Sequence, residues 1–111
     1  MLRSIKSTQR EMRQLELIVD GTGTAALSGP AVHQASLVDN GAGDYTITFD
    51  QAYAAIPVCI AVPVTTGVIC RIKAASSSAV NVECLDVETG LVATDADFHL
   101  LVIGSDVADS Y

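Results

Sequence analysis

The segment at residues 44–50, Asp-Tyr-Thr-Ile-Thr-Phe-Asp, alternates large apolar side chains with threonines. Side chains of a β-strand point to opposite faces with a period of two, so Tyr45, Ile47 and Phe49 share one face. The preceding Asn-Gly-Ala-Gly supplies glycines for a tight reversal of the chain. The segment is therefore expected to be a half-buried strand whose aromatic side chains lie in a core.

Short apolar segments of the same kind recur along the chain, separated by glycine, proline or serine. Pro57 and Pro63 indicate that the segment at 57–64 lies at a sheet edge or has irregular ends. The last segment, residues 97–104, has apolar side chains on both faces of the expected strand, so both faces are expected to be buried. Strands are expected at residues 14–20, 24–28, 32–39, 44–50, 57–64, 68–75, 79–87 and 97–104. This spacing predicts an all-β domain, an antiparallel β-sandwich or a small barrel.

One hairpin has a predictable register around the three serines 76–78. Pairing Ala75 with Ala79 places Lys73 opposite Asn81, Arg71 opposite Glu83 and Cys70 opposite Cys84. Cysteines that face each other across an antiparallel pair are close to disulfide distance. In a reducing compartment we expect two packed thiols, with a bridge as the alternative.

Charge is distributed unevenly along a chain whose formal net charge is −7. Arg3, Lys6, Arg10 and Arg13 are four of the six basic residues, and with Glu11 they give residues 1–13 a net charge of +3. The remaining residues, 14–111, therefore carry −10. We interpret residues 1–13 as an arm, extended or with a short helix, on a sandwich domain at 14–111; a frayed, solvated terminus is the alternative.

The residues that most forms of catalysis require do not occur in recognisable patterns. The sequence lacks a GxSxG nucleophile elbow, paired histidine ligands and both phosphate-binding glycine motifs. The acidic segment at 86–97 departs from the spacing of a calcium-binding loop. The acidic charge argues against nucleic acid, and no apolar stretch is long enough to span a membrane. We expect a protein that is no enzyme and has no cofactor or metal site.

The segment Asn-Gly-Ala-Gly-Asp-Tyr-Thr-Ile-Thr-Phe at 40–49, followed by Pro57-Val58, resembles a pattern in tailed-bacteriophage virion proteins. The pattern, G-x-G-D-Y-T-[IV]-x-F before a P-x-V strand, occurs in capsid decoration (cement) proteins, head fibres and tail-fibre knobs. The resemblance extends more loosely over residues 30–111. It implies an antiparallel β-sandwich that assembles as a homotrimer.

The resemblance also implies a function: a structural virion protein that decorates and stabilises the capsid by binding across neighbouring capsid subunits. The partners would be the major capsid protein and further copies of this chain, with Arg3, Lys6, Arg10 and Arg13 as candidate capsid contacts. The protein would be made in the host bacterial cytoplasm and would lie on the capsid exterior. The alternative is a trimeric tail-fibre or head-fibre knob that binds host-surface carbohydrate, for which Tyr53 and Tyr111 are the candidate platforms. The short chain, without shaft or attachment regions, favours decoration.

Overall fold

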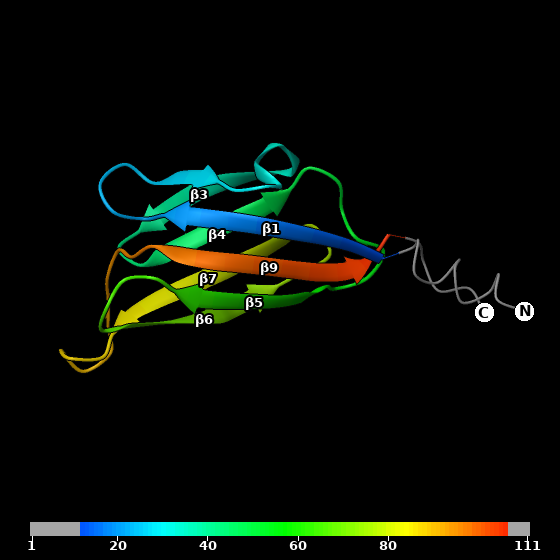
Figure 1. The fold of residues 1–111 in the computed structure, drawn as a ribbon. Helices are drawn as coiled ribbons and strands as arrows, with labels where there is room; N and C mark the ends of the chain where they lie inside the picture. Colours follow the sequence, from blue (N-terminus) through cyan, green and yellow to red (C-terminus); the bar gives the residue numbers. More distant parts are fainter. Residues whose placement is uncertain (1–11, 107–111) are drawn as a thin grey trace, which may run out of the picture.

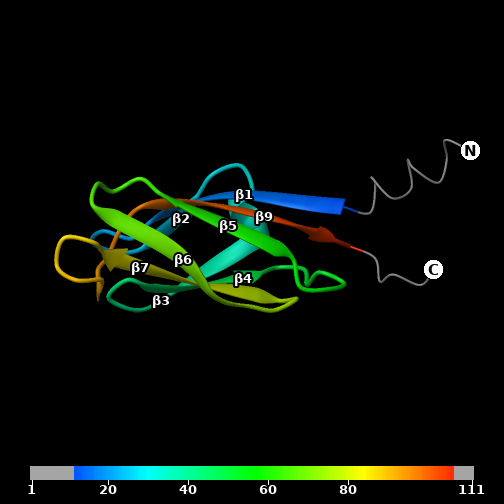
Figure 2. The same ribbon diagram turned by 90° about the horizontal axis from the view of Figure 1, so that it is seen from below.

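The computed structural model describes residues 12–106, which fold into two antiparallel β-sheets packed face to face (Figure 1). The predicted all-β sandwich is confirmed. Figure 2, seen from below, shows the two layers with β5 of one sheet running beside β6 of the other. Within the described residues no helix is long and apolar enough to cross a membrane.

The four-stranded sheet has the order β2-β1-β9-β5, so that the first and last long strands lie next to each other at its centre. Its strands are β1 (Met12–Asp20), β2 (Ala26–Ser28), β5 (Val58–Pro63) and β9 (Phe98–Ser105). β5 is an edge strand, as the two prolines predict, because proline lacks the N–H that a central strand must donate.

The five-stranded sheet has the order β3-β4-β7-β6, with the short β8 paired to β7. Its strands are β3 (Ala35–Gly41), β4 (Asp44–Phe49), β6 (Val68–Ala75), β7 (Ala79–Asp86) and β8 (Val92–Ala93). β4 and β7 occupy the centre and carry the most regular alternation of buried and half-exposed residues. Each therefore contributes a row of side chains to the space between the sheets.

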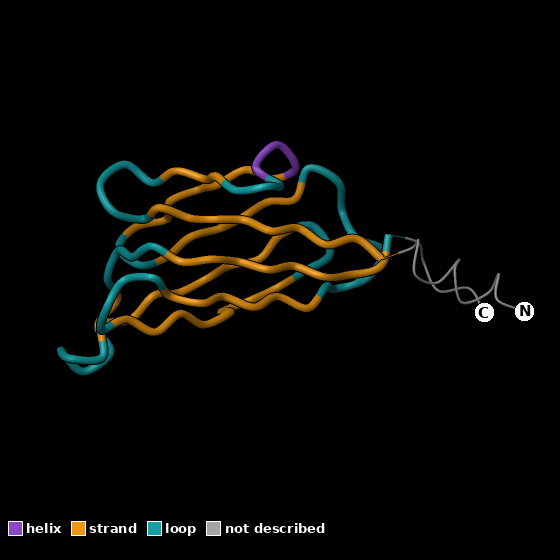
Figure 3. The backbone as a smooth tube through the Cα atoms, viewed as in Figure 1, coloured by secondary structure: helices purple, strands orange, loops and turns teal. Residues whose placement is uncertain are grey.

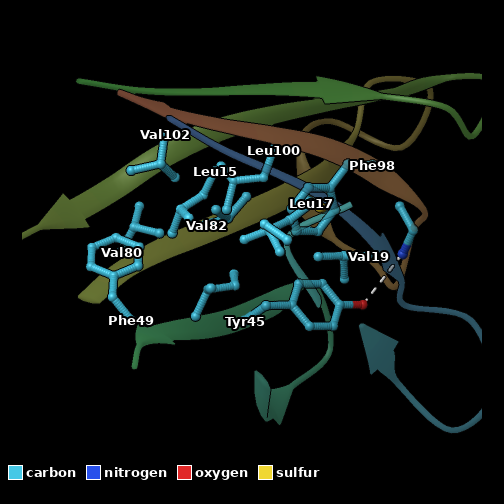
Figure 4. Packing of buried hydrophobic residues seen from close by; sticks show 14 of the residues in the cluster. Leu15, Leu17, Val19, Tyr45, Phe49, Val80, Val82, Phe98, Leu100 and Val102 are labelled. Carbon is cyan, nitrogen blue, oxygen red and sulfur yellow. Dashed lines mark hydrogen bonds between the residues drawn. The ribbon is translucent and has the colours of Figure 1, made fainter. Parts of the chain in front are cut away.

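The core lies between the inward rows of the two sheets, as Figure 4 shows. Tyr45, Ile47 and Phe49 of β4 are buried together, as the alternation predicts. The Tyr45 and Phe98 rings lie 5.6 Å apart between centroids, which joins the two sheets at one end. The remaining buried apolar residues of the core are Leu15, Leu17, Val19, Ala31, Tyr53, Val80, Val82, Cys84, Ala96, Leu100 and Val102.

The predicted strand at 32–39 is only partly correct. Residues Val32–Gln34 form a 3₁₀ turn, η1, drawn in purple in Figure 3, and β3 follows it. Hydrogen bonds from Val32 N–H to the Gly29 carbonyl and from Gln34 N–H to the Ala31 carbonyl close the turn. A further bond from Ala31 N–H to the Glu16 carbonyl holds it against β1. The local turn and its one tertiary hydrogen bond to β1 therefore replace the strand expected at residues 32–34.

The β6–β7 hairpin keeps the predicted register only in part. Cys70 faces Cys84 and Arg71 faces Glu83, but a bulge at Lys73 places Ala74 opposite Asn81. The predicted pairings of Lys73 with Asn81 and of Ala75 with Ala79 are therefore wrong, since Ala75 faces Val80. Lys73 Nζ instead lies 3.2 Å from Asp44 Oδ2. Asp44 is on β4, outside the hairpin, so this ion pair does not follow from the hairpin sequence.

Candidate interaction surface

The outer faces of the two sheets differ in chemistry. On the five-stranded sheet, Asp44 Oδ1 accepts a 2.7 Å hydrogen bond from Asn81 Nδ2, and Arg71 lies 2.7 Å from Glu83. The hydrogen bonds from Asn81 and Lys73 lower the pKa of Asp44, with Asn81 the larger cause. These charged and amide groups are therefore paired with one another on this face, which also exposes Val38 and Ile69.

The outer face of the four-stranded sheet is mostly aliphatic. The strand pairing arranges its side chains in three rows across β1, β9 and β5, the strands at the front of Figure 1. The rows are Gln14–Ile103–Val58, Glu16–Leu101–Ile60 and Ile18–His99–Val62. We call the six apolar members, Ile18, Val58, Ile60, Val62, Leu101 and Ile103, the aliphatic face.

The aliphatic face is open in the single chain. Val58 is 64% exposed, Val62 54% and Ile60 48%, whereas Leu101 and Ile103 are half-buried. A shallow groove of about 360 Å³ crosses the face between Ile18 and Val62. The expectation that residues 97–104 are buried on both faces is therefore wrong for one chain, because nothing within the described residues covers the outer side of β9.

β5 combines this open face with a free edge. An edge strand exposes unpaired backbone groups, and soluble proteins usually protect such a strand with lysines or other charges. The sequence of β5, Val-Cys-Ile-Ala-Val-Pro, contains no charged residue. Contiguous exposed apolar surface of this kind marks interaction sites in folded proteins. The face and the edge together form the strongest candidate interaction surface of the described chain.

The four predicted capsid-contact residues divide between two regions. Arg3, Lys6 and Arg10 lie outside the described residues. Arg13 lies in β1, which begins at Met12, two residues before the expected start of the domain. Its guanidinium pairs with Asp106 at 2.7 Å, donates to the Gln51 carbonyl at 2.8 Å and lies 4.0 Å from the centre of the Tyr53 ring. Arg13 is thus held within the domain.

The described aromatic side chains offer no platform for a sugar. Tyr53, the candidate within this region, is only 4% exposed and packs edge-on against Phe49 at 5.3 Å between ring centroids. The expectation that Tyr53 is available for a sugar is therefore wrong. Tyr111 lies outside the described residues. The described part of the chain contains no group of three or more His, Cys, Asp or Glu side chains that could hold a metal ion.

The motif at 40–49 lies away from the aliphatic face and organises a corner of the sandwich. The Tyr45 hydroxyl lies 3.0 Å from Asp95 Oδ1 and 3.2 Å from the Gly21 carbonyl, and it accepts the Ala96 N–H at 3.4 Å. Asp95 Oδ1 also accepts the Gly43 N–H at 3.0 Å. The motif residues thus connect three loops, which is a structural role.

No motif in the sequence marks the aliphatic face. The sequence nevertheless contains a sign of it, since residues 57–64 and 97–104 carry aliphatic side chains at both odd and even positions, and so on both faces of a strand. Strands that are buried on both faces have apolar side chains on both faces. Which side remains open depends on the strand order, and that order appears only in the folded sheet.

Comparison with known proteins adds no relative: no family model, curated protein or solved structure matches the chain.

Proposed function

We propose that this chain is a structural protein of a tailed-bacteriophage virion that decorates the capsid and binds across neighbouring capsid subunits. The observation that carries the proposal is the open aliphatic face on a domain whose other sheet carries paired charged and amide groups on its outer face. Such a two-sided module is suited to assembly, since one sheet face can be buried against a partner while the other stays in water. The resemblance of residues 40–49 to phage virion proteins supplies the biological setting.

The partner on the aliphatic face is a second copy of the chain, within the homotrimer that the resemblance implies. Obligate interfaces between identical subunits are more apolar than other interfaces and resemble a domain core cut in half. The aliphatic face has this character, and its polar neighbours include one carboxylate, on Glu16, and one imidazole, on His99. A second copy supplies the same apolar surface. It also supplies an imidazole that can pair with Glu16 and a carboxylate that can pair with His99.

The capsid contact is assigned to the basic segment that precedes β1. Arg3, Lys6 and Arg10 carry positive charge, whereas residues 14–111 have a net charge of −10. Charges of one sign on a short segment can direct it toward an acidic patch on a partner without engaging the body of the domain. A protein that binds only the assembled shell stabilises that shell by mass action.

Co-sedimentation with undecorated phage heads tests the proposal. Purified protein is mixed with heads and centrifuged at a speed that pellets heads but leaves the protein alone in solution. Decoration predicts that the protein appears in the pellet and saturates at a fixed ratio to the capsid subunit. Protein that remains in the supernatant at all concentrations contradicts decoration, and binding to host-surface polysaccharide instead would support the knob.

A further inference from the structure

Two cysteines face each other on the core side of the five-stranded sheet, one on an edge strand and one on the neighbouring central strand. Cys70 of β6 is directly opposite Cys84 of β7, and their Sγ atoms lie 3.3 Å apart as free thiols. β6 is the edge strand of this sheet, joined to it by β7 alone. A covalent bond between these sulfurs would therefore tie an edge strand to the centre of the sheet.

The backbone at this position suits a cross-strand disulfide. Cys84 N–H donates to the Gly43 carbonyl, and the Cys84 carbonyl accepts the Thr94 N–H. Both backbone groups of Cys84 therefore point away from β6, which makes Cys70 and Cys84 a non-hydrogen-bonded pair. Residues of such pairs lie closer together than hydrogen-bonded ones, with Cα atoms about 4.5 Å apart. That spacing falls at the short end of the range of about 4.4–6.8 Å in which disulfides form.

The two thiols differ in exposure and in the direction of their pKa shifts. Cys70 is partly exposed, and the hydrogen bond from Cys84 lowers its pKa. Cys84 is fully buried, and the hydrogen bond with Cys70 together with burial raises its pKa. Because Cys70 is the more exposed of the two, it is the thiol that meets an oxidant first, and the Cys84 sulfur lies 3.3 Å from it.

Cys59 is the natural internal comparison. It lies on β5 in the opposite sheet and is also partly buried, but burial alone raises its pKa. Its Sγ contacts the Pro57 carbonyl at 3.9 Å and has no thiol opposite it in the strand pairing, where its partner is Val102. An oxidant should therefore treat Cys59 and the Cys70–Cys84 pair differently.

We propose that Cys70 and Cys84 are an oxidisable pair that hydrogen peroxide converts into a cross-strand disulfide, which joins β6 to β7 covalently. The Cys70 thiolate attacks one peroxide oxygen, the O–O bond breaks, and sulfenic acid and hydroxide form. The Cys84 sulfur then attacks the Cys70 sulfur, the S–O bond breaks, and water leaves. Hydroxide takes up the proton that Cys70 had released. In total two thiols lose two electrons, and one peroxide becomes two waters.

The disulfide stabilises the fold by restricting the unfolded chain. The bond closes a segment running from residue 70 to residue 84, and such closure removes conformations from the unfolded ensemble but few from a hairpin already formed. The oxidised protein should therefore unfold at a higher temperature than the reduced protein. This inference does not depend on the proposed function, since both states are measured on the isolated protein.

Intact-mass measurement after treatment of the full chain with hydrogen peroxide tests the proposal. The chain should lose about two mass units, and dithiothreitol should restore them. Peptide mapping should place the bridge between Cys70 and Cys84. The matched control Cys59→Ser should lose the same mass, whereas Cys70→Ser and Cys84→Ser should not. The melting temperature of the oxidised wild type should exceed that of the reduced form by about 5–15 °C.

Three results would overturn the proposal. The first is a wild-type chain that keeps its full mass, or gains only oxygen, when peroxide is in excess. The second is a two-unit loss that persists in Cys84→Ser, since Cys59 would then be the partner. The third is a dimer on a non-reducing gel in place of the internal bridge. Because the reduced and oxidised wild type share one sequence, the thermal comparison does not depend on whether a serine variant folds.

Discussion

The hydroxyl of Tyr45 shows how much one polar atom can organise in a small core. It lies at the end of a buried ring, next to the carboxylate of Asp95 and the backbone of Gly21 and Ala96. Burial raises the pKa of this phenol, with the Asp95 hydrogen bond as a second cause. A side chain on Gly21 would collide with the Tyr45 hydroxyl and the Ala96 carbonyl, so glycine is required there.

Tyr45→Phe is expected to destabilise the domain by about 1–3 kcal/mol, because it leaves the buried Gly21 carbonyl and Ala96 N–H without their partner. The matched control is Tyr53→Phe, which removes only a 3.3 Å hydrogen bond to the Arg13 carbonyl and should cost less. Urea denaturation at pH 7 measures both free energies of unfolding. An equal or smaller loss for Tyr45→Phe would contradict the role assigned to its hydroxyl.

Asp44 predicts a pH dependence of stability. Its pKa is lowered in the folded protein from an ordinary value of 3.8, first by the Asn81 hydrogen bond. A carboxyl group whose folded pKa is lowered contributes stability above its unfolded pKa and loses it as the pH falls through the folded pKa. Asp44→Asn should therefore lower the urea midpoint at pH 6, and the gap to wild type should narrow below about pH 4. A gap that stays constant from pH 6 to pH 2.5 would show that the charge of Asp44 contributes nothing.

At the scale of elements, β5 and β9 are stable strands whose outer sides lack a cover. Their inward residues, Cys59, Ala61, Leu100 and Val102, pack against the core. Their outward residues form most of the aliphatic face. The single chain therefore buries one side of each strand in its own core and leaves the other side exposed.

Ile60→Lys is expected to weaken self-association at least about a hundredfold, because an unpaired ammonium buried at an apolar interface costs several kcal/mol. The matched control is Val38→Lys on β3, one of the two edge strands of the other sheet. Val38 is 50% exposed and Ile60 48%, so the two changes differ in face and hardly in burial. Sedimentation velocity over a range of concentrations measures the association.

The two lysine variants also show which results would contradict self-association through the aliphatic face. Both should retain the wild-type unfolding midpoint as isolated domains, since both positions are exposed. Equal weakening by the two would place the interface elsewhere or show a general charge effect. A wild-type protein that stays monomeric at high concentration would remove the aliphatic face as a self-association surface.

Across the whole molecule, charge separates the segment before β1 from the domain. Changing Arg3, Lys6 and Arg10 together to glutamate reverses the charge of that segment and should abolish co-sedimentation with phage heads. The free energy of unfolding should stay within about 0.5 kcal/mol of wild type. Wild-type head binding by the triple variant would show that these three residues are not capsid contacts.

Arg13 should behave differently from the other three basic residues. Its guanidinium lies between Asp106, the Gln51 carbonyl and the Tyr53 ring, and its side chain is 14% exposed. Arg13→Glu should therefore destabilise the domain by about 1–3 kcal/mol, measured by urea denaturation. A stable variant that nevertheless fails to bind heads would return Arg13 to the set of capsid contacts.

Sequence patterns predicted the strands well because alternation has a direct physical cause, the two-residue period of the pleated chain. The buried row of β4, the edge position of β5 and the facing of Cys70 and Cys84 all follow from patterns a few residues long. The 3₁₀ turn at Val32–Gln34 and the bulge at Lys73 do not follow, because partners on other strands hold them in place.

The sequence by itself determined that the chain is all β, where most of its strands lie and that its basic charge gathers near one end. Only the tertiary structure decided which sides of the apolar strands are covered. Strand order places β9 between β1 and β5 and the second sheet against one side alone, so the other side stays open. Apolar side chains on a strand face indicate that burial of that face is favourable. The arrangement of the sheets decides whether the chain's own core buries that face or leaves it exposed.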